Sequence, residues 1–279
     1  MRIIDMNSYG TFGRQLRLQR LHKHTDERLF IVPMDHSVTT GPISGGGGLS
    51  ALVRQISANG ADAVVLHKGT ARQVDHRWFA GTSLIVHLSA STVCAADPDA
   101  KYLVASVEES VRLGADAVSV HVNLGSRDER QQISDLALVA DQSDRWGVPL
   151  LAMMYPRGPK IDDPGNPELI AHAATVAADL GADIVKLPPP NSVSDLADVV
   201  DACPIPVVVA GGAPRGDLDQ LVSYVDGVMM TGASGVAVGR NIFQAPDATA
   251  ATRRVAESVH RVAEAIPPAR MASLQTNIG

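Results

Sequence analysis

Short apolar runs alternate along nearly the whole chain with longer stretches of helical periodicity. The apolar runs are rich in Val, Ile and Leu and contain few interleaved polar residues, a pattern typical of parallel strands that are covered on both faces. The sequence predicts eight such strands, at residues 29–34, 63–66, 84–88, 117–122, 150–154, 184–187, 206–210 and 235–238.

Between the predicted strands, apolar residues recur at the spacing of one helix face. Helices are predicted at residues 49–59, 102–113, 127–145, 167–180, 193–202, 216–231 and 247–265. A further helix at 12–21 precedes the first strand and is expected to close one end of the fold. Gly-Ala-Asp recurs at 60–62, 114–116 and 181–183, with the variant Gly-Ala-Ser at 232–234. In each repeat, glycine supplies the left-handed residue that ends a helix.

Eight consecutive strand–helix units in a chain of this length indicate an α/β fold, the TIM (β/α)8 barrel, here with an extra N-terminal helix. A doubly wound open sheet is the alternative, but no Gly-x-Gly-x-x-Gly follows the first predicted strand. No linker or shift in composition divides the chain. We therefore expect residues 1–279 to form a single barrel domain.

Composition excludes several classes of protein. With 45% hydrophobic and 19% charged residues, the chain is that of an ordinary globular protein. A net charge of −6 and 4% aromatic residues argue against a nucleic-acid partner. No apolar run is long enough to cross a bilayer, and basic residues such as Arg14 and Arg17 interrupt the N-terminal segment where a signal peptide would need an apolar core. We expect a cytoplasmic protein with no membrane partner.

Two isolated cysteines, Cys94 and Cys203, lack the spacing of a zinc site or a disulfide framework. We expect both to be small buried residues with free thiols.

Ionisable and glycine residues gather where the predicted strands end. In a TIM barrel, chemistry takes place at the C-terminal ends of the strands, so these residues are expected to converge on one catalytic rim. They are Asp35, His36, His67, Lys68, His87, His121, Tyr155, Arg157, Lys186, Gly211, Gly212, Gly239 and Arg240.

Lys186 lies inside the apolar run Ile-Val-Lys-Leu. An ammonium on a buried strand is costly, so a lysine there is either held in an ion pair or available as a neutral amine. A neutral amine is the nucleophile that attacks a carbonyl to form a Schiff base. The residue pattern alone leaves both interpretations open.

His67, His87 and His121 end successive predicted strands, an arrangement that raises the question of a shared metal ion. No His-x-His pair or cluster of carboxylates completes such a site. We therefore expect these histidines to form hydrogen bonds or to contact substrate, and we expect no metal.

The last two predicted strands end in glycine-rich turns, where barrels commonly bind phosphate through backbone N–H groups. The candidate phosphate-binding residues are Gly211 and Gly212 in one turn, and Gly239 and Arg240 in the other. Tight-turn geometry alone would also explain these glycines. A third glycine run, Gly45–Gly48, is expected to be a lid or a linker.

Several motifs also resemble those of a known family. They are Val-Pro-Met-Asp-His at 32–36, Leu-His-Lys-Gly at 66–69, Met-Met-Tyr-Pro-Arg-Gly at 153–158, Ala-Asp-Ile-Val-Lys at 182–186, Pro-Val-Val-Val-Ala-Gly-Gly at 206–212 and Gly-Val-Ala-Val-Gly-Arg-Asn-Ile-Phe-Gln at 235–244. Together they resemble the class I aldolases related to archaeal fructose-bisphosphate aldolase, over about residues 12–265. Within that family, they are most similar to the 2-amino-3,7-dideoxy-threo-hept-6-ulosonate synthases and the related synthase of the aminohydroxybenzoate route.

The resemblance implies roles for individual residues. Lys186 would form the Schiff base, Tyr155 would act as a general acid/base, and Asp35 would be a second acid/base near the imine. Around the same rim, the side chains expected to contact substrate are His36, His67, His121 and Arg157. The resemblance also implies phosphate at the glycine turns, no cofactor beyond the covalent imine, and a homo-oligomer, commonly a decamer.

The expected reaction joins a ketose-phosphate donor, either dihydroxyacetone phosphate or a deoxyketohexose phosphate, to aspartate semialdehyde and gives a seven-carbon amino keto acid. Fructose-bisphosphate aldolase, a thiolase-type acyl transferase and a non-catalytic phosphate-binding protein are the alternatives. One departure bears on this choice. After Lys186, this chain has Leu-Pro-Pro-Pro where relatives carry a Thr/Ser-Tyr-Thr type of sequence. Prolines provide no N–H donor, which disfavours a second phosphate there.

Overall fold

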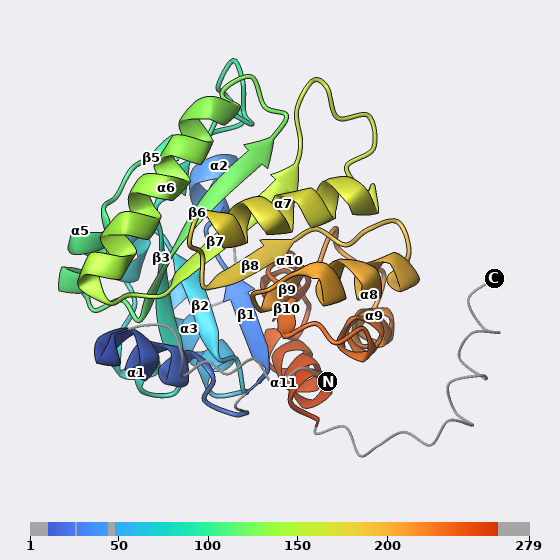
Figure 1. The fold of residues 1–279 in the computed structure, drawn as a ribbon. Coiled ribbons are helices and arrows are strands. Elements are labelled where there is room, and N and C mark those ends of the chain that lie inside the picture. The colour runs from blue at the N-terminus through green and yellow to red at the C-terminus, as the bar shows by residue number, and fades with distance from the viewer. Residues whose placement is uncertain (1–10, 26, 44–47, 262–279) are drawn as a thin grey trace.

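The computed structural model describes residues 11–25, 27–43 and 48–261, and its eight parallel strands close into a barrel (Figure 1). The strands follow one another around the barrel in the order β1-β10-β9-β8-β7-β6-β3-β2. Their bounds are β1 Leu29–Pro33, β2 Ala63–Leu66, β3 Ser83–His87, β6 Ala117–Leu124, β7 Leu150–Pro156, β8 Ile184–Leu187, β9 Val207–Ala210 and β10 Gly235–Ala237. This confirms the predicted TIM barrel.

Helices cover the outside of the barrel and connect successive strands. The longer ones are α1 Phe12–Leu21, α3 Gly48–Ser57, α5 Val107–Leu113, α6 Glu129–Trp146, α7 Pro167–Asp179, α8 Val193–Ala202, α9 Leu218–Met230 and α11 Ala248–His260. Shorter elements lie in the loops: α2 His36–Thr40, α4 Lys68–Ala71, η1 His76–Ala80, α10 Arg240–Phe243 and the antiparallel pair β4 Ser89–Ala90 and β5 Tyr102–Leu103. Among the described residues, no helix is long and apolar enough to span a membrane.

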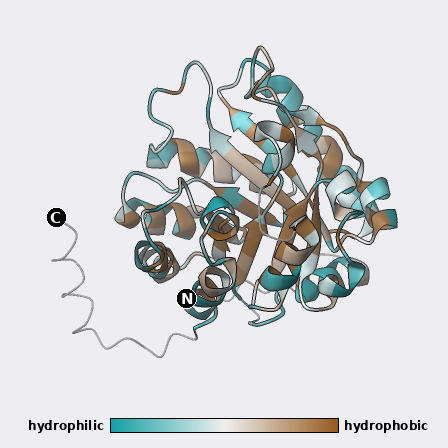
Figure 2. Ribbon diagram, turned by 180° about the vertical axis from the view of Figure 1, so that it is seen from behind, coloured by the Kyte–Doolittle hydropathy of each residue, from teal (hydrophilic) through white to brown (hydrophobic). Residues whose placement is uncertain are grey.

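The core has two layers, which follow from the two faces of the sheet. Residues that point outward from the strands pack against the surrounding helices. Residues that point inward fill the lower part of the barrel interior, where Leu29, Ile31 and Leu151 pack with Leu18 and Leu21 of α1. Figure 2 shows hydrophobic residues concentrated in the barrel strands and hydrophilic ones on the outer helices. As predicted, α1 closes the N-terminal end of the barrel, called the bottom below; the opposite end is the mouth.

The repeated Gly-Ala-Asp turns have a defined structural role at the bottom. Their glycines all adopt positive φ, from 91° to 96°. Their aspartates accept hydrogen bonds from backbone N–H groups of the preceding barrel strands: Asp62 from Phe30 at 2.6 Å, Asp116 from Leu84 at 3.1 Å and Asp183 from Leu150 at 2.8 Å. The repeat therefore ties each new strand to its neighbour.

Two expectations need correction. Residues 102–113 do not form one helix, because Tyr102–Leu103 pairs with Ser89–Ala90 as a small sheet and α5 starts only at Val107. Cys94 is exposed rather than buried, and Cys203 is half-buried; both are free thiols. The glycine run 45–48 lies outside the described residues except for Gly48, the first residue of α3, and so do residues 262–265 of the last predicted helix.

Candidate active site

Each inward-facing row of residues becomes polar as it approaches the mouth. In β7, Leu151 and Met153 belong to the apolar interior, and Tyr155 packs partly against it. In β8, Ile184 is followed at the next inward position by Lys186. Because side chains alternate along a strand, this two-residue period carries polar groups into the barrel just above its apolar filling. The fold therefore gathers polar side chains at the mouth of the barrel, in a partly buried region that we call the bowl. Its residues are Asp35, His67, His87, His121, Tyr155 and Lys186.

Lys186 is 7% exposed and lies beside Met153 of β7, its partner in the strand register. Its Nζ is 3.8 Å from Met153 Sδ and 5.8 Å from the centre of the Tyr155 ring. No carboxylate in the described part of the chain lies within ion-pair distance of this amine. The ion-pair interpretation therefore lacks a partner, and Lys186 is a buried amine that faces the mouth.

Asp35 follows β1 and lies across the bowl from Lys186. Its Oδ1 is buried and accepts no hydrogen bond within the described residues. The closest basic atoms, His36 Nδ1 and His87 Nε2, are each 3.9 Å from the carboxylate. Burial raises the pKa of this carboxyl, but His87 and Lys186 lower it by more, so the pKa of Asp35 lies below its ordinary value. Asp35 is thus an ionised carboxylate whose Oδ1 is free to accept a hydrogen bond or a proton.

Tyr155 lies between Lys186 of β8 and His121 of β6. The ring of His121 stacks on it with centres 4.8 Å apart, and the Arg157 guanidinium lies 5.3 Å from the ring centre. His121 is in turn held by Asn123, whose Oδ1 is 2.9 Å from His121 Nε2. These contacts fix the ring, so the phenol has a defined position near the amine.

Burial keeps the rim histidines neutral at ordinary pH. It lowers the pKa of His87 to about 4 and lowers the pKa values of His36 and His67. Burial also lowers the pKa of His121 well below its ordinary value, with Lys101 adding to the effect. Neutral imidazoles can both donate and accept a hydrogen bond, which suits contacts to a substrate with hydroxyl and carbonyl groups.

The four predicted substrate-contacting residues fall into separate places. His121 and Arg157 flank Tyr155, as just described. His67 Nε2 lies 3.2 Å from the backbone carbonyl oxygen of Asp35, and its ring contacts that of His87 edge-on. His36 lies between the Asp35 carboxylate, 3.9 Å from its Nδ1, and the ring of Phe243, which it contacts edge-on. In the described ranges, the one group of side chains arranged to share a metal ion is His24, Asp62 and His260 at the bottom, not the rim histidines.

The two predicted phosphate-binding turns lie side by side. Gly211 N donates to the Ala237 carbonyl oxygen at 2.9 Å, which continues the pairing of β9 and β10. Arg240 crosses from one turn to the other and donates to the Gly212 carbonyl oxygen at 3.1 Å. A Cβ at Gly239 would lie 2.6 Å from the Pro33 carbonyl oxygen, so only glycine fits between β10 and β1. These turns form one rim opposite β6 and β3.

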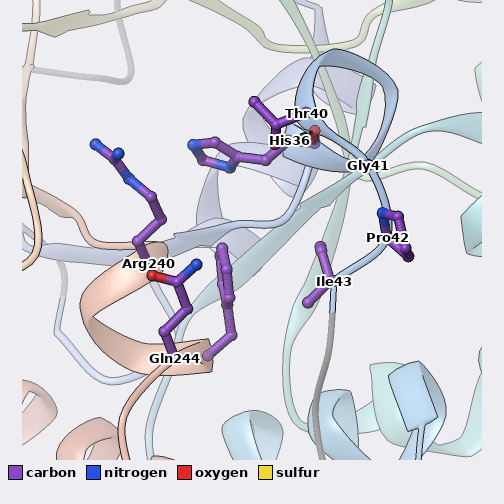
Figure 3. A pocket seen from close by; sticks show the side chains of 8 residues that line it. His36, Thr40, Gly41, Pro42, Ile43, Arg240 and Gln244 are labelled. Carbon is purple, nitrogen blue, oxygen red and sulfur yellow. Dashed lines mark hydrogen bonds between the residues drawn. The ribbon is translucent and has the colours of Figure 1, made fainter.

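A pocket opens beside these turns, between the β1–α2 segment and α10 (Figure 3). His36 and Arg240 line it together with Thr40, Gly41, Pro42, Ile43, Phe243 and Gln244. The pocket thus combines a partly exposed imidazole and a guanidinium on the phosphate side of the mouth.

The mouth also contains groups for which the sequence predicts no specific role. His87, predicted only as a rim residue, places its Nε2 3.9 Å from the Asp35 carboxylate, and Ser119 Oγ, 2.8 Å from His87 Nδ1, holds it in place. The alternation of side chains along β3 and β6 would have predicted both positions. Ile85 and Ala117 point into the barrel, so His87 and Ser119, two residues further along each strand, point inward as well. Lys101 is the larger omission, since it lies in a loop and no strand pattern indicates its burial.

Comparison with known proteins places this geometry in context. Residues 29–245 match the model of a family described as DeoC/LacD family aldolase. The chain is 59% identical over 249 residues to a 2-amino-4,5-dihydroxy-6-oxo-7-(phosphonooxy)heptanoate synthase of Streptomyces griseus, which covers 89% of this chain and 91% of the relative. It is 44% identical over 248 residues to a 2-amino-3,7-dideoxy-D-threo-hept-6-ulosonate synthase of Halobacterium salinarum, covering 89% and 92%.

Solved structures agree in fold. A Schiff-base-forming fructose-1,6-bisphosphate aldolase superimposes with a TM-score of 0.81 at 29% identity, over 88% of this chain and 98% of that one. An archaeal fructose-1,6-bisphosphate aldolase whose catalytic lysine is covalently bound to a carbinolamine intermediate also gives a TM-score of 0.81, at 28% identity and with the same coverage.

Proposed function

The chain belongs to the DeoC/LacD family of aldolases, and we propose that it is a class I aldol synthase that joins dihydroxyacetone phosphate to aspartate semialdehyde through a Schiff base on Lys186. The family match spans the whole barrel from β1 to the end of α10.

The acceptor follows from the chemistry of the relatives' product names. In 2-amino-4,5-dihydroxy-6-oxo-7-(phosphonooxy)heptanoate, the ketone is at carbon 6, so an aldol reaction makes the bond between carbons 4 and 5. Cleaving that bond leaves 2-amino-4-oxobutanoate, which is aspartate semialdehyde, and dihydroxyacetone phosphate. The same cleavage of the 2-amino-3,7-dideoxyheptulosonate skeleton leaves the same four-carbon aldehyde. Both relatives therefore support one acceptor.

The donor is where the two relatives differ. The product of the Streptomyces enzyme carries a phosphate on carbon 7, whereas the archaeal product has no oxygen there. The joined turns at Gly212 and Gly239, where Arg240 adds a positive charge at the rim, suit a phosphate group, which both candidate donors carry. Dihydroxyacetone phosphate leaves its phosphate on carbon 7 of the product, which agrees with the higher identity to the first relative. We therefore favour dihydroxyacetone phosphate over a deoxyketohexose phosphate.

The reaction begins at the buried amine. Lys186, as the neutral amine, attacks the ketone carbon of the donor, and loss of water from the resulting carbinolamine gives an iminium. The iminium draws electrons from the neighbouring C–H bond, so a base can remove that proton and leave an enamine. The enamine carbon then attacks the aldehyde carbon of the acceptor, and the alkoxide formed takes up a proton. Hydrolysis of the new iminium releases the product and restores the amine.

Tyr155 and Asp35 are the two groups at the mouth that can move these protons. Tyr155 has a hydroxyl that can give and take a proton, and its ring is fixed 5.8 Å from Lys186 Nζ by the stacked His121. Asp35 is ionised, so it accepts a proton first and can donate one only after that. Its free Oδ1 is suited to receive the proton that leaves the amine or the carbinolamine.

The single observation that carries this proposal is the environment of Lys186. A buried lysine is normally paired, because burying an unpaired ammonium is costly. Here the amine lies 7% exposed between Met153 and Tyr155, with its nearest hydrogen-bonding neighbour a thioether sulfur. Such a position serves a nucleophile better than a structural cation.

The test compares acceptors. The purified enzyme is given dihydroxyacetone phosphate with aspartate semialdehyde or with glyceraldehyde 3-phosphate, and kcat/KM is measured for each. We expect aspartate semialdehyde to be far the better acceptor and the product to have the mass of the seven-carbon amino keto acid phosphate. A preference for glyceraldehyde 3-phosphate would instead assign the chain to the fructose-bisphosphate aldolases, which its structural neighbours represent.

A further inference from the structure

Resting on the proposed function, we propose that Lys101 is the anchor for the carboxylate of the acceptor aldehyde, in a subsite that it forms with Arg157 across the mouth from the phosphate turns. The sequence motifs give this lysine no role, and it is not at the end of a barrel strand. Its position in the fold, its burial and its lack of a counterion carry the inference.

Lys101 is a second buried cation in the mouth. It is 9% exposed, at the inner end of the loop that joins β4 to β5. Its Nζ donates to Ser91 Oγ at 2.5 Å, and Ser91 in turn donates to the Pro98 carbonyl oxygen at 2.6 Å. Within the described chain, Lys101 has no carboxylate at ion-pair distance. A buried ammonium that is held by one hydroxyl leaves donors free for an anion.

The charges around Lys101 place it in the active-site bowl. Burial lowers the pKa of Lys101 and the Arg157 guanidinium lowers it further, whereas Asp35 and Asp99 raise it. Lys101 also lowers the pKa values of His121 and His87, the histidines next to Tyr155 and Asp35. Arg157 approaches a carboxylate of the same loop, Asp99, only to 3.9 Å. Lys101 and Arg157 thus place two cations near each other, and the one ion-pair contact either makes among the described residues is that of Arg157 with Asp99, an arrangement that attracts an anionic ligand.

The loop that carries Lys101 is built into the catalytic wall. The Asp99 carbonyl oxygen accepts from Asn123 Nδ2 at 2.8 Å and from Gln132 Nε2 at 3.0 Å. Asn123 also holds His121, the ring that stacks on Tyr155. The position of Lys101 is thus fixed relative to the residues that flank Lys186, as recognition of a small substrate requires.

Barrel topology sets the direction of the bound chain. In the closed order, β3 and β6 lie opposite β9 and β10, with β7 and β8 between them on one side. Phosphate bound at the β9 and β10 turns, a ketone carbon at Lys186 of β8 and a carboxylate at Lys101 near β3 would follow the order of groups along the product. The carboxylate at carbon 1 and the phosphate at carbon 7 then occupy opposite rims.

The experiment uses the full-length enzyme and three acceptors with dihydroxyacetone phosphate: aspartate semialdehyde, propanal and glyceraldehyde 3-phosphate. In Lys101→Met, the ratio of kcat/KM for aspartate semialdehyde to that for propanal should fall about 10- to 150-fold, the range for one charge-assisted hydrogen bond. Lys101→Arg should recover part of this ratio. Ser91→Ala, which frees the ammonium, should raise KM for aspartate semialdehyde more than it changes kcat.

The three acceptors distinguish a carboxylate anchor from a structural residue and from a phosphate ligand. An equal loss with propanal and aspartate semialdehyde would make Lys101 a structural residue, and a larger loss with glyceraldehyde 3-phosphate would make it a phosphate ligand; either would overturn the proposal. Borohydride trapping with dihydroxyacetone phosphate alone is measured in parallel and does not involve the acceptor. Failure to trap the donor on the unmodified enzyme would therefore count against the proposed function, not against the subsite.

Discussion

The two ends of the barrel bury charged groups in opposite ways. At the bottom, the Asp62 carboxylate is fully buried and accepts from Phe30 N, from His24 Nδ1 at 2.6 Å and from His260 Nε2 at 2.9 Å. At the mouth, Asp35 Oδ1 is buried with no donor, and Lys186 has no carboxylate at ion-pair distance in the part of the chain that the structure describes. Paired charges hold the structure together, whereas unpaired ones are available for chemistry.

The bottom repeats this pairing around the barrel. Besides Asp62, Asp116 lies 3.7 Å from Arg20, and Asp183 lies 3.6 Å from Arg14. Each of these aspartates has a basic partner from α1 or the segment that follows it, namely His24, Arg20 and Arg14, and His260 of α11 is a second partner of Asp62. The N-terminal helix is thereby fastened to the aspartates of the Gly-Ala-Asp turns. Arg14 is an exception to full pairing, because its Nε and Nη2 are buried without acceptors.

The largest expected effect comes from removing the unpaired carboxylate at the mouth. Asp35→Asn should slow turnover by roughly two to four orders of magnitude, the usual contribution of a general acid/base. The free energy of unfolding should fall by less than in Asp62→Asn, because no hydrogen bond to Oδ1 is lost, although the lowered pKa of Asp35 means that its ionised form contributes some stability. Steady-state kinetics and urea denaturation on the same preparation measure both. A large loss of stability would show that Asp35 is a structural residue like Asp62.

Tyr155→Phe removes only a hydroxyl, so packing against His121 should survive. Exchange of the donor's proton with solvent should slow by about two to four orders of magnitude, while imine formation persists. Mass spectrometry of donor deuteration in heavy water follows the exchange, and borohydride trapping follows the imine. Exchange at the unmodified rate would exclude the phenol as the acid/base.

At the bottom, the same kind of substitution should act on stability instead. Asp62→Asn places an amide N–H group against three hydrogen-bond donors and should lower the free energy of unfolding by roughly 3–5 kcal/mol, as expected for a broken buried ion pair. The folded variant should keep its kcat. Asp144→Asn is the matched control, because this carboxylate is 74% exposed and should contribute within about 0.5 kcal/mol. Equal urea midpoints for the two variants would contradict the assigned role of Asp62.

The smallest expected effect is a dependence of stability on pH. The hydrogen bond to Asp62 raises the pKa of His24, and burial together with the nearby Lys23 opposes this shift. A raised pKa in the folded state stabilises the protein fully below the unfolded value of about 6.5, and this stabilisation is lost as pH rises through the folded value. The pKa of Asp62 is lowered, so its own contribution is lost only as pH falls below about 4.

His24→Asn retains a donor to Asp62 without titrating near neutral pH, so it isolates this effect. The stability difference between the unmodified chain and the variant should be larger near pH 5.5 than near pH 8.5, by about 0.2–1 kcal/mol for a side chain that is partly exposed. The rim histidines are the same in both proteins, so their contribution to the pH dependence of stability cancels in this difference. Their lowered pKa values would otherwise act in the opposite sense. A difference that does not change with pH would mean that His24 stays neutral.

The sequence predicts most of the barrel because its strands are continuous apolar runs. The predicted strands differ from the observed ones by one or two residues, as at 150–154 against Leu150–Pro156. Short helices such as His36–Thr40 and Arg240–Phe243 are less than two turns long, so no periodicity reveals them. The pairing of β4 with β5 joins residues that are distant in sequence and leaves no local pattern.

For the site, the sequence locates the residues but not their partners. Strand ends identify Lys186, Tyr155 and Asp35, which the structure brings to one bowl. The positions of strand ends do not show which buried charges have a partner. Asp62 and Asp35 differ in this respect, and only the structure shows it. Lys101 becomes visible only once the loop after β4 is folded over the mouth and its burial is known.

The most direct measurement identifies the lysine that forms the imine. The enzyme is incubated with dihydroxyacetone phosphate, reduced with borohydride, digested and analysed by mass spectrometry, alongside Lys186→Met and the matched control Lys68→Met. Lys68 also follows a barrel strand, but it is paired with Glu109 at 2.9 Å. We expect an adduct on Lys186 in the unmodified enzyme and in Lys68→Met, and none in Lys186→Met. An adduct on Lys68, or undiminished trapping in Lys186→Met, would contradict it.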